Sequence, residues 1–213
     1  MSAHALGVVA LVLLVGCAAH HSAPRQRPFE DDPFSESTEL ARYGRQLSLS
    51  PGLRSFNDDG FGRLQDQLSL SLDYCEPMGL GPLRLEGGLH YSYDEADGTF
   101  QGQDVRLKAR TFELSAGVNY SLLVWRFRPY VGGGAAFQFL NLTGVDEEAN
   151  TEFDDDDGTL GGYLKAGILF QTTRASHIGL EYRRLLGGEV TLDGTDLDTS
   201  YDQVALVFGS SLE

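Results

Sequence analysis

The sequence predicts an all-β fold, an eight-stranded antiparallel up-and-down transmembrane β-barrel with a polar interior. Apolar and polar residues alternate with a period of two from residue 45 onward, and no helical period competes with this pattern. Along the chain, long acidic connections alternate with short connections between these stretches. Strands of about ten residues are also long enough to cross a bilayer at a tilt.

The composition restricts the function classes before any strand is considered. The chain has 213 residues, enough for one domain, with 31 acidic against 16 basic side chains. A net charge of -15 argues against nucleic acid as a partner, because that binding depends on clustered Lys and Arg. The two cysteines, Cys17 and Cys75, form no zinc or redox spacing, and we expect neither a metal nor a cofactor.

Residues 1–16 have the features of a signal peptide for export. Their apolar run is too short to span a bilayer as an ordinary helix. The segment Leu14–Cys17 resembles the lipobox of bacterial lipoproteins, a resemblance that implies acylation of Cys17 as the mature N-terminus. Ordinary cleavage near Ala18 or Ala19 is the alternative.

Residues 17–44 are expected to form a flexible linker, because Pro24, Pro28 and Pro33 are spread through a polar stretch without an apolar period. The barrel domain is then expected over residues 45–213. If Cys17 is acylated, Cys75 has no partner for an intramolecular disulfide.

The strands follow one another along the barrel domain. The alternation is plainest in the second stretch, where Leu68, Leu70 and Leu72 alternate with small or polar residues. The other stretches repeat the pattern on odd or even positions. The eight expected strands cover residues 46–56, 68–74, 83–93, 112–121, 131–139, 160–171, 178–183 and 200–210.

The connections alternate in length and charge. The long connections hold more than half of the acidic residues and no Lys or Arg, and the short ones are mildly basic. Because each kind falls on one end of an up-and-down barrel, one rim is predicted to be anionic. The long connections are 57–62, 94–104, 143–158 and 187–200, and the short ones are 75–82, 122–129 and 172–176.

A soluble lipocalin-type barrel and a membrane barrel both show this alternation, so the inside must be identified from its residues. Charges of both signs lie on the face opposite the leucines, whereas Tyr74 and Tyr120 near one rim, and Tyr93 and Phe139 near the other, lie on the apolar face. Such girdles favour a membrane barrel. The expected interior polar network is Arg84, Glu86, His90, Glu113, Lys165, Glu181 and Arg183.

The stretches Arg128–Phe137 and Gly179–Arg183 resemble strands of the small eight-stranded outer-membrane β-barrel family that includes OmpA-type domains. This resemblance implies a place in the outer membrane of a Gram-negative-type envelope and a structural or surface-interaction role, as a monomer among outer-membrane lipids. Members of that family usually end in an aromatic residue. Here Phe208 is followed by five more residues.

An eight-stranded barrel is only wide enough for its own side chains, so the interior network is expected to form a plug. A narrow porin-like channel for small solutes is the alternative. Three cations and three carboxylates balance in this network, and removing Glu181 should strand a cation, either Lys165 or Arg183. Removing that cation as well should restore part of the stability.

Catalysis is not expected. The sequence His90-Tyr91-Ser92 is similar to the His-x-Ser element of outer-membrane lipid A deacylases, in which histidine activates serine. Those enzymes continue with asparagine, whereas this chain has Tyr93, and the alternation places His90 and Ser92 inside, away from a lipid ester. A lipid-modifying enzyme therefore remains only an alternative.

Two charged segments near the anionic rim are candidate contact sites. The run Asp154–Asp157 lacks the alternating spacers of a calcium loop, so we expect a solvated acidic loop that meets surface ligands, and no specific metal site. Arg106, Lys108 and Arg110 share the outward parity of Phe112 and would contact lipid phosphates. The alternatives are a bulge near Thr111 that turns them inward, or pairing with the acidic loops.

Overall fold

The computed structural model describes residues 44–57, 64–100, 103–146, 151–173, 175–192 and 195–212. The predicted signal peptide 1–16, Cys17 and the predicted linker up to residue 43 lie outside the described residues. Within the described ranges, no helix is long and apolar enough to cross a membrane.

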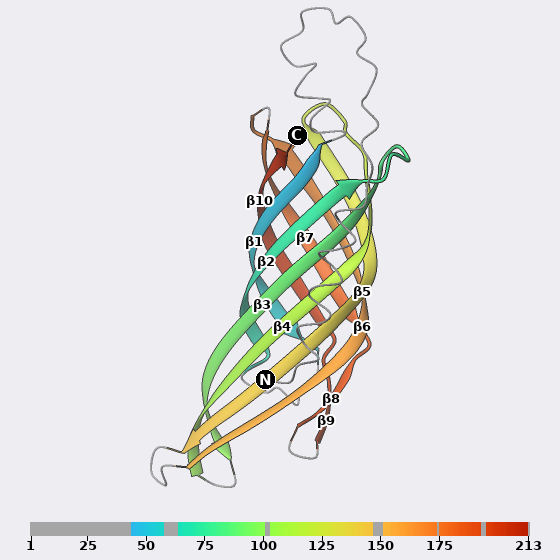
Figure 1. Cartoon of the computed structure of the whole chain (residues 1–213). Helices are drawn as coiled ribbons and strands as arrows, with labels where there is room; N and C mark the ends of the chain where they lie inside the picture. The colour runs from blue at the N-terminus through green and yellow to red at the C-terminus, as the bar shows by residue number, and fades with distance from the viewer. Residues whose placement is uncertain are drawn as a thin grey trace, which may run out of the picture. The chain divides into compact units, whose positions relative to one another are not determined.

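Eight of the ten strands among the described residues close an antiparallel barrel in the order β1-β10-β7-β6-β5-β4-β3-β2, and β8 pairs with β9 (Figure 1). The predicted barrel and its strand order are confirmed. The strands are β1 (Arg45–Phe56), β2 (Asp66–Pro77), β3 (Leu83–Phe100), β4 (Gln103–Ser121), β5 (Phe127–Asp146), β6 (Thr151–Gln171), β7 (Ser176–Leu186), β8 (Glu189–Leu192), β9 (Thr195–Asp198) and β10 (Tyr201–Leu212).

The side chains alternate between a polar interior and an apolar exterior. Leu68 and Leu164 are 70% and 59% exposed, whereas their neighbours Ser69 and Lys165 are buried. The same alternation runs along β10, where Phe208 points outward and Val207 inward. This arrangement is the reverse of a lipocalin-type barrel, whose interior is apolar, so the lipocalin alternative is wrong.

The barrel wall is much taller on one side. Strands β3 to β6 have 18 to 21 residues, whereas β1, β2, β7 and β10 have 11 or 12. Figure 1 shows β3 to β6 continuing past the other barrel strands at one end, here called the long-strand end. The opposite end, with connections 78–82, 122–126 and 172–175, is the short-turn end.

Two segments that were predicted to be loops belong mostly to the long strands of the tall wall. Most of 94–104 belongs to β3 and β4, which stay paired up to Phe100 and Gln103, and most of 143–158 belongs to β5 and β6. The acidic run Asp154–Asp157 therefore lies in a strand, opposite residues 140–143 of β5. Interstrand backbone hydrogen bonds outweigh the repulsion of the carboxylates, which alternate between the two faces of the sheet.

The third predicted loop, 187–200, is also ordered. It holds the β8–β9 hairpin, whose Val190 is 1% exposed and packs in a cluster with Phe56, Leu140 and Leu185 of the barrel. The backbone N–H of Thr191 donates to the Asp157 carboxylate at 2.8 Å. The hairpin thus packs apolar side chains against inner residues of the barrel near the long-strand end.

Interior glycines make room for interior aromatic rings. A Cβ atom at Gly117 would collide with the Tyr163 hydroxyl, and one at Gly167 would collide with the Tyr130 ring. Both tyrosines are buried and direct their hydroxyl groups to carboxylates inside the barrel, Glu86 for Tyr163 and Glu181 for Tyr130. Each tyrosine ring can therefore reach its carboxylate because another strand has a glycine, with no Cβ atom, where the ring passes.

Candidate functional site: the charged barrel interior

The structure places all seven residues of the predicted polar network inside the barrel, each at most 7% exposed. They come from strands β3, β4, β6 and β7, because the two-residue period of each strand turns every second side chain inward. Among the described residues, further buried charges join them. These additional residues are Arg54, Asp73 and Arg128.

Lys165 is the centre of one group of charges, the Lys165 cluster, formed with Asp73, Glu86 and Glu181. Its Nζ atom lies 3.1 Å from Glu86, 3.3 Å from Glu181 and 3.5 Å from Asp73. The Tyr130 hydroxyl donates to the same Glu181 oxygen at 2.7 Å. The partner of Glu181 is therefore Lys165 on the neighbouring strand, one of the two cations that the sequence allowed.

Glu113 is the centre of a second group, the Glu113 cluster, formed with Arg54, Arg183 and Tyr201. Arg183 donates to one carboxylate oxygen, and the Tyr201 hydroxyl donates to the other at 2.6 Å. Arg54 approaches that second oxygen at 3.6 Å. All four side chains are at most 1% exposed, so this cluster has one carboxylate for two guanidinium groups without access to water.

His90 lies between the two clusters. Its Nε2 atom is 4.0 Å from Asp73 on one side and 4.0 Å from Glu113 on the other. The ring also hydrogen-bonds the hydroxyls of Ser71 and Ser115, at 2.8 and 3.1 Å. The network is therefore continuous across the middle of the barrel.

Ser92 has a different partner. Its hydroxyl donates to the Gln67 side chain at 2.6 Å, and both Ser92 and His90 are at most 1% exposed inside the barrel. The ring nitrogens of His90 reach Ser71 and Ser115 rather than Ser92. The arrangement accounts for His90 and Ser92 as parts of the interior hydrogen-bond network.

The short-turn end of the interior holds a small polar cavity of about 30 Å³. Arg128 and Gln46 lie at its edge toward the turns, and Lys165 and Glu181 line it toward the middle of the barrel. This volume has room for about two water molecules.

The strand register brings acidic residues of β3 opposite two of the three basic residues of β4. Lys108 lies directly opposite Glu95, and Arg106 opposite Asp97, whereas Arg110 lies opposite Tyr93. Arg110 is exposed and shares the outward parity of Phe112, so no bulge turns this strand inward. The side chain of Arg106 lies outside the described residues. The register therefore favours pairing with acidic residues for Lys108 and Arg106 and not for Arg110.

Among the described residues, no group of three or more His, Cys, Asp or Glu side chains is arranged to hold a metal ion. Cys75 has a free thiol that lines the small cavity, and Cys17 lies outside the described residues.

Several members of the site were not expected from the sequence. Arg54 was missed because Pro51-Gly52 interrupts the alternation of the first strand, although β1 continues through both residues. Asp73 and Arg128 share the inward parity of recognised residues and could have been found by extending the alternation to the strand ends. Tyr201 lies within the expected last strand, 200–210, on the parity opposite to its outward-facing apolar residues, and the same extension could have found it.

Comparisons with known proteins identify the fold. No protein-family model matches the chain, and no curated protein matches its sequence. Among solved structures, Ail of Yersinia pestis, crystallised with the heparin analogue sucrose octasulfate, superposes with a TM-score of 0.54 and 13% identity over 80% of this chain and 99% of that one.

Two further structures agree. OprG of Pseudomonas aeruginosa gives a TM-score of 0.57 with 11% identity over 81% of this chain and 97% of that chain. A major outer membrane protein of Thermus thermophilus gives 0.56 with 13% identity over 79% and 98%. The chain has the fold of the small eight-stranded outer-membrane β-barrels.

Proposed function

We propose that this protein is a closed outer-membrane barrel of the bacterial envelope that conducts no solutes and acts structurally and through contacts at its long-strand end. The observation that carries the proposal is the filling of the interior. Ion-paired side chains fill the middle of the barrel, and the β8–β9 hairpin adds Val190 to the apolar cluster near the long-strand end. The fold shared with bacterial outer-membrane proteins supports the location.

Conductance in a planar bilayer tests the closure. The unmodified protein is expected to give no steady current at neutral pH. A Val190→Asp, Leu197→Asp variant unseats the hairpin but leaves both charged clusters, so it should also stay closed. A stable, ion-selective current from the unmodified protein would overturn the proposal in favour of a narrow channel. Current from the variant alone would assign the closure to the hairpin.

Insertion tests the location. Leu70→Arg places a charge on the apolar outer face, where Leu70 lies opposite Pro51 and Tyr91, and we expect a loss of about 2 to 4 kcal/mol in a lipid bilayer near its midplane. Glu189→Arg, on the exposed side of the hairpin, is the matched control and should leave the stability in the bilayer unchanged. Equal tolerance of both variants would contradict a membrane-spanning barrel.

The long-strand end presents carboxylates that favour cationic surface ligands. Asp156, Glu189 and Asp198 are exposed there, and Asp94 and Asp155 are half-buried. A hexalysine peptide should therefore bind the protein in vesicles at low salt and dissociate as salt is added. Sucrose octasulfate, found with Ail, should not bind. Binding of the polyanion and not of the peptide would reverse this assignment.

Contact with lipid phosphates is proposed for the basic residues of β4, with Arg110 as the main contributor. Lys108 and Arg106 lie opposite acidic residues, whereas Arg110 lies opposite Tyr93 and Asn141 and is exposed. Arg110→Gln should reduce stability in vesicles with anionic lipid and leave it unchanged in purely zwitterionic vesicles. Loss of equal size in both vesicles would exclude a phosphate contact.

We propose no catalytic role. The buried positions of His90 and Ser92, and their separate hydrogen-bond partners, support that proposal over the lipid-modifying alternative. Ser92→Ala should leave any ester-cleaving activity of the preparation unchanged. An activity that disappears in Ser92→Ala would establish an enzyme.

A further inference from the structure

An exposed apolar patch lies on two neighbouring turns at the short-turn end, 78–82 and 122–126. The turns are joined by a hydrogen bond from the Ser121 N–H to the Pro82 carbonyl, at 3.1 Å. The third turn at this end differs, because its Thr172 and Thr173 are polar and exposed. The side chains of the patch, here called the turn patch, are Met78 39%, Leu80 63%, Leu122 47%, Val124 62%, Trp125 75% and Phe127 41% exposed.

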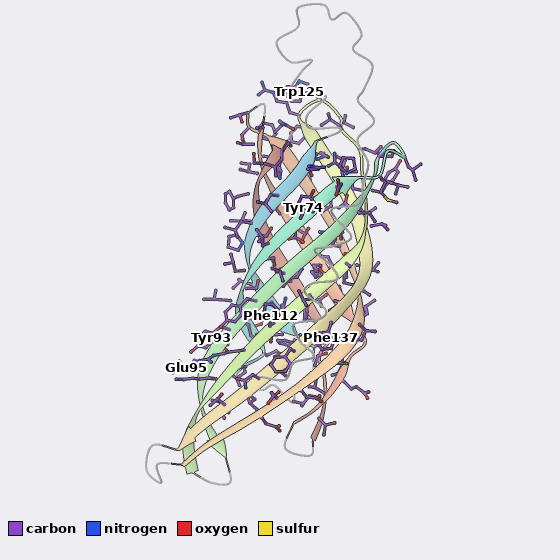
Figure 2. The ribbon with its side chains drawn as sticks, in the orientation of Figure 1. Tyr74, Tyr93, Glu95, Phe112, Trp125 and Phe137 are labelled. Carbon is purple, nitrogen blue, oxygen red and sulfur yellow. The ribbon has the colours of Figure 1, made fainter. Side chains whose placement is uncertain are left out.

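The turn patch continues the apolar outer face of the barrel. Val118, Tyr120 and Leu122 follow one another along the outward face of β4 and into the turn, and all three are exposed. Tyr120 belongs to the predicted aromatic girdle, so Leu122 and Trp125 reach beyond the girdle. Figure 2 shows Trp125 at the tip of the short-turn end, farther out than Tyr74.

Trp125 has a backbone conformation that suits glycine rather than a bulky residue. Val124 and Phe127 exchange two backbone hydrogen bonds, of 2.8 and 3.0 Å, around a two-residue turn. Trp125 adopts a φ of 56° in that turn, in the left-handed region. Such a conformation is strained for a residue with a Cβ atom. The ring is nevertheless 75% exposed, so packing within the barrel does not offset this strain.

The neighbours of Trp125 supply a cation at the same level. The Arg126 guanidinium lies 5.6 Å from the Trp125 ring centroid, and the Phe127 ring lies 6.0 Å from it. Phe127 in turn contacts Phe170 at 5.3 Å between centroids. The turn thus presents an indole with a polar N–H, a guanidinium and an apolar base, the set of groups that prefers a membrane–water interface.

We infer that the turn patch is an interfacial anchor that inserts Trp125 into the phospholipid headgroup layer at the short-turn end. The continuity of the patch with the lipid-facing surface favours lipid over a protein partner, because no polar belt separates the two. In the strand order, the polar turn 172–175 lies across the barrel from turn 78–82. The anchor is therefore confined to the side of the barrel where the short turns connect β2 to β3 and β4 to β5. This inference rests on the proposed membrane location.

The fluorescence of Trp125 tests the anchor, because it is the single tryptophan of the chain. The full chain is inserted into phosphatidylcholine vesicles whose lipids carry bromine either close to the headgroup or near the chain ends. Emission should shift to shorter wavelength than in denaturant, and the shallow bromine should quench it several-fold more than the deep bromine. Emission typical of water, quenched by acrylamide and by neither lipid, would overturn the inference.

A second tryptophan position separates failure of the anchor from failure of the membrane location. In Trp125→Phe combined with Phe112→Trp, the reporter lies on the lipid-facing surface of β4, where Phe112 is 43% exposed. Bromolipids should quench it if the barrel is inserted. Quenching at this position without quenching of Trp125 would reject the anchor alone, and quenching at neither would reject the membrane-spanning barrel as well.

A matched variant tests whether the anchor is confined to one side. Trp125→Phe combined with Thr173→Trp moves the only tryptophan to the polar turn. This reporter should remain accessible to acrylamide, with several-fold weaker quenching by shallow bromine than Trp125. Equal quenching at the two turns would show that every short turn reaches the headgroup layer, and the turn patch would then have no separate role.

Discussion

The Lys165 cluster and the Glu113 cluster lie in one barrel but are built with opposite charge ratios. One ammonium group serves three carboxylates in the first, and one carboxylate serves two guanidinium groups in the second. Each cluster therefore depends on its central residue rather than on separate ion pairs. The two differ in one further respect, since carboxylates can take up protons but guanidinium groups cannot lose theirs.

Removal of the central carboxylate should have the largest effect. Glu113→Gln leaves Arg54 and Arg183 buried without an anion, and neither can become neutral. We expect a loss of about 4 to 5 kcal/mol in the free energy of unfolding, of similar size from mildly acidic to mildly basic pH. Reversible urea unfolding in lipid vesicles would measure it. A loss that disappears in acid would mean that the guanidinium groups have another source of compensation.

Removal of the central cation should have a smaller effect that depends on pH. Lys165→Met leaves three carboxylates together, and we expect a loss of about 3 kcal/mol at neutral pH. The folded variant should bind protons more readily than its unfolded chain, so its stability relative to the unmodified protein should rise as the pH falls. The same urea series at several pH values tests this. A loss that grows in acid would contradict the cluster as described.

Removal of one outer member should cost less still. Glu181→Gln leaves Lys165 with Asp73 and Glu86, and the amide oxygen can still accept the Tyr130 hydroxyl. We expect a loss of about 1 to 2 kcal/mol. Adding Lys165→Met should restore none of it, because Asp73 and Glu86 would then lose their cation. Partial recovery in this double variant, as simple pairing of charges predicts, would indicate isolated ion pairs.

An exposed ion pair on the outer face of the barrel should contribute least to the free energy of unfolding. Arg184 lies 3.7 Å from Asp202, and both side chains are at least one-third exposed. Arg184→Met should change the free energy of unfolding by less than about 1 kcal/mol, because water and salt screen the pair. A loss as large as that of Lys165→Met would show that burial does not distinguish the interior clusters.

The sequence predicted which charged residues lie inside the barrel better than it predicted which of them contact one another. Glu113 and Arg183 were assigned to the interior from parity alone, and both are buried there. Their contact joins β4 to β7, which are not neighbours in the barrel, so it depends on how far each side chain reaches across the lumen. Arg54 was missed because Pro51-Gly52 hides the parity of β1.

The ends of the strands were less predictable than their middles. In the membrane-spanning part each residue faces either lipid or the lumen, and the requirement for opposite polarity leaves a two-residue period in the sequence. Beyond the apolar band the polarity of the two faces changes, because Lys108 and Arg110 share the outward parity of β4 whereas Ala109 and, on β5, Leu140 are buried on the inner face. The rule of apolar outside and polar inside therefore no longer identifies the strands, although they continue.

The sequence by itself determined the number of barrel strands, their order and which face of each strand is apolar. These properties follow from local alternation and from turn spacing, which every strand carries independently. Only the tertiary structure decided the rest, namely the shared partners of Lys165 and Glu113, the tall wall of β3 to β6 and the packing of the β8–β9 hairpin against the barrel. Those features depend on contacts between residues far apart in the chain, made when the barrel closes and brings opposite strands within reach of one another.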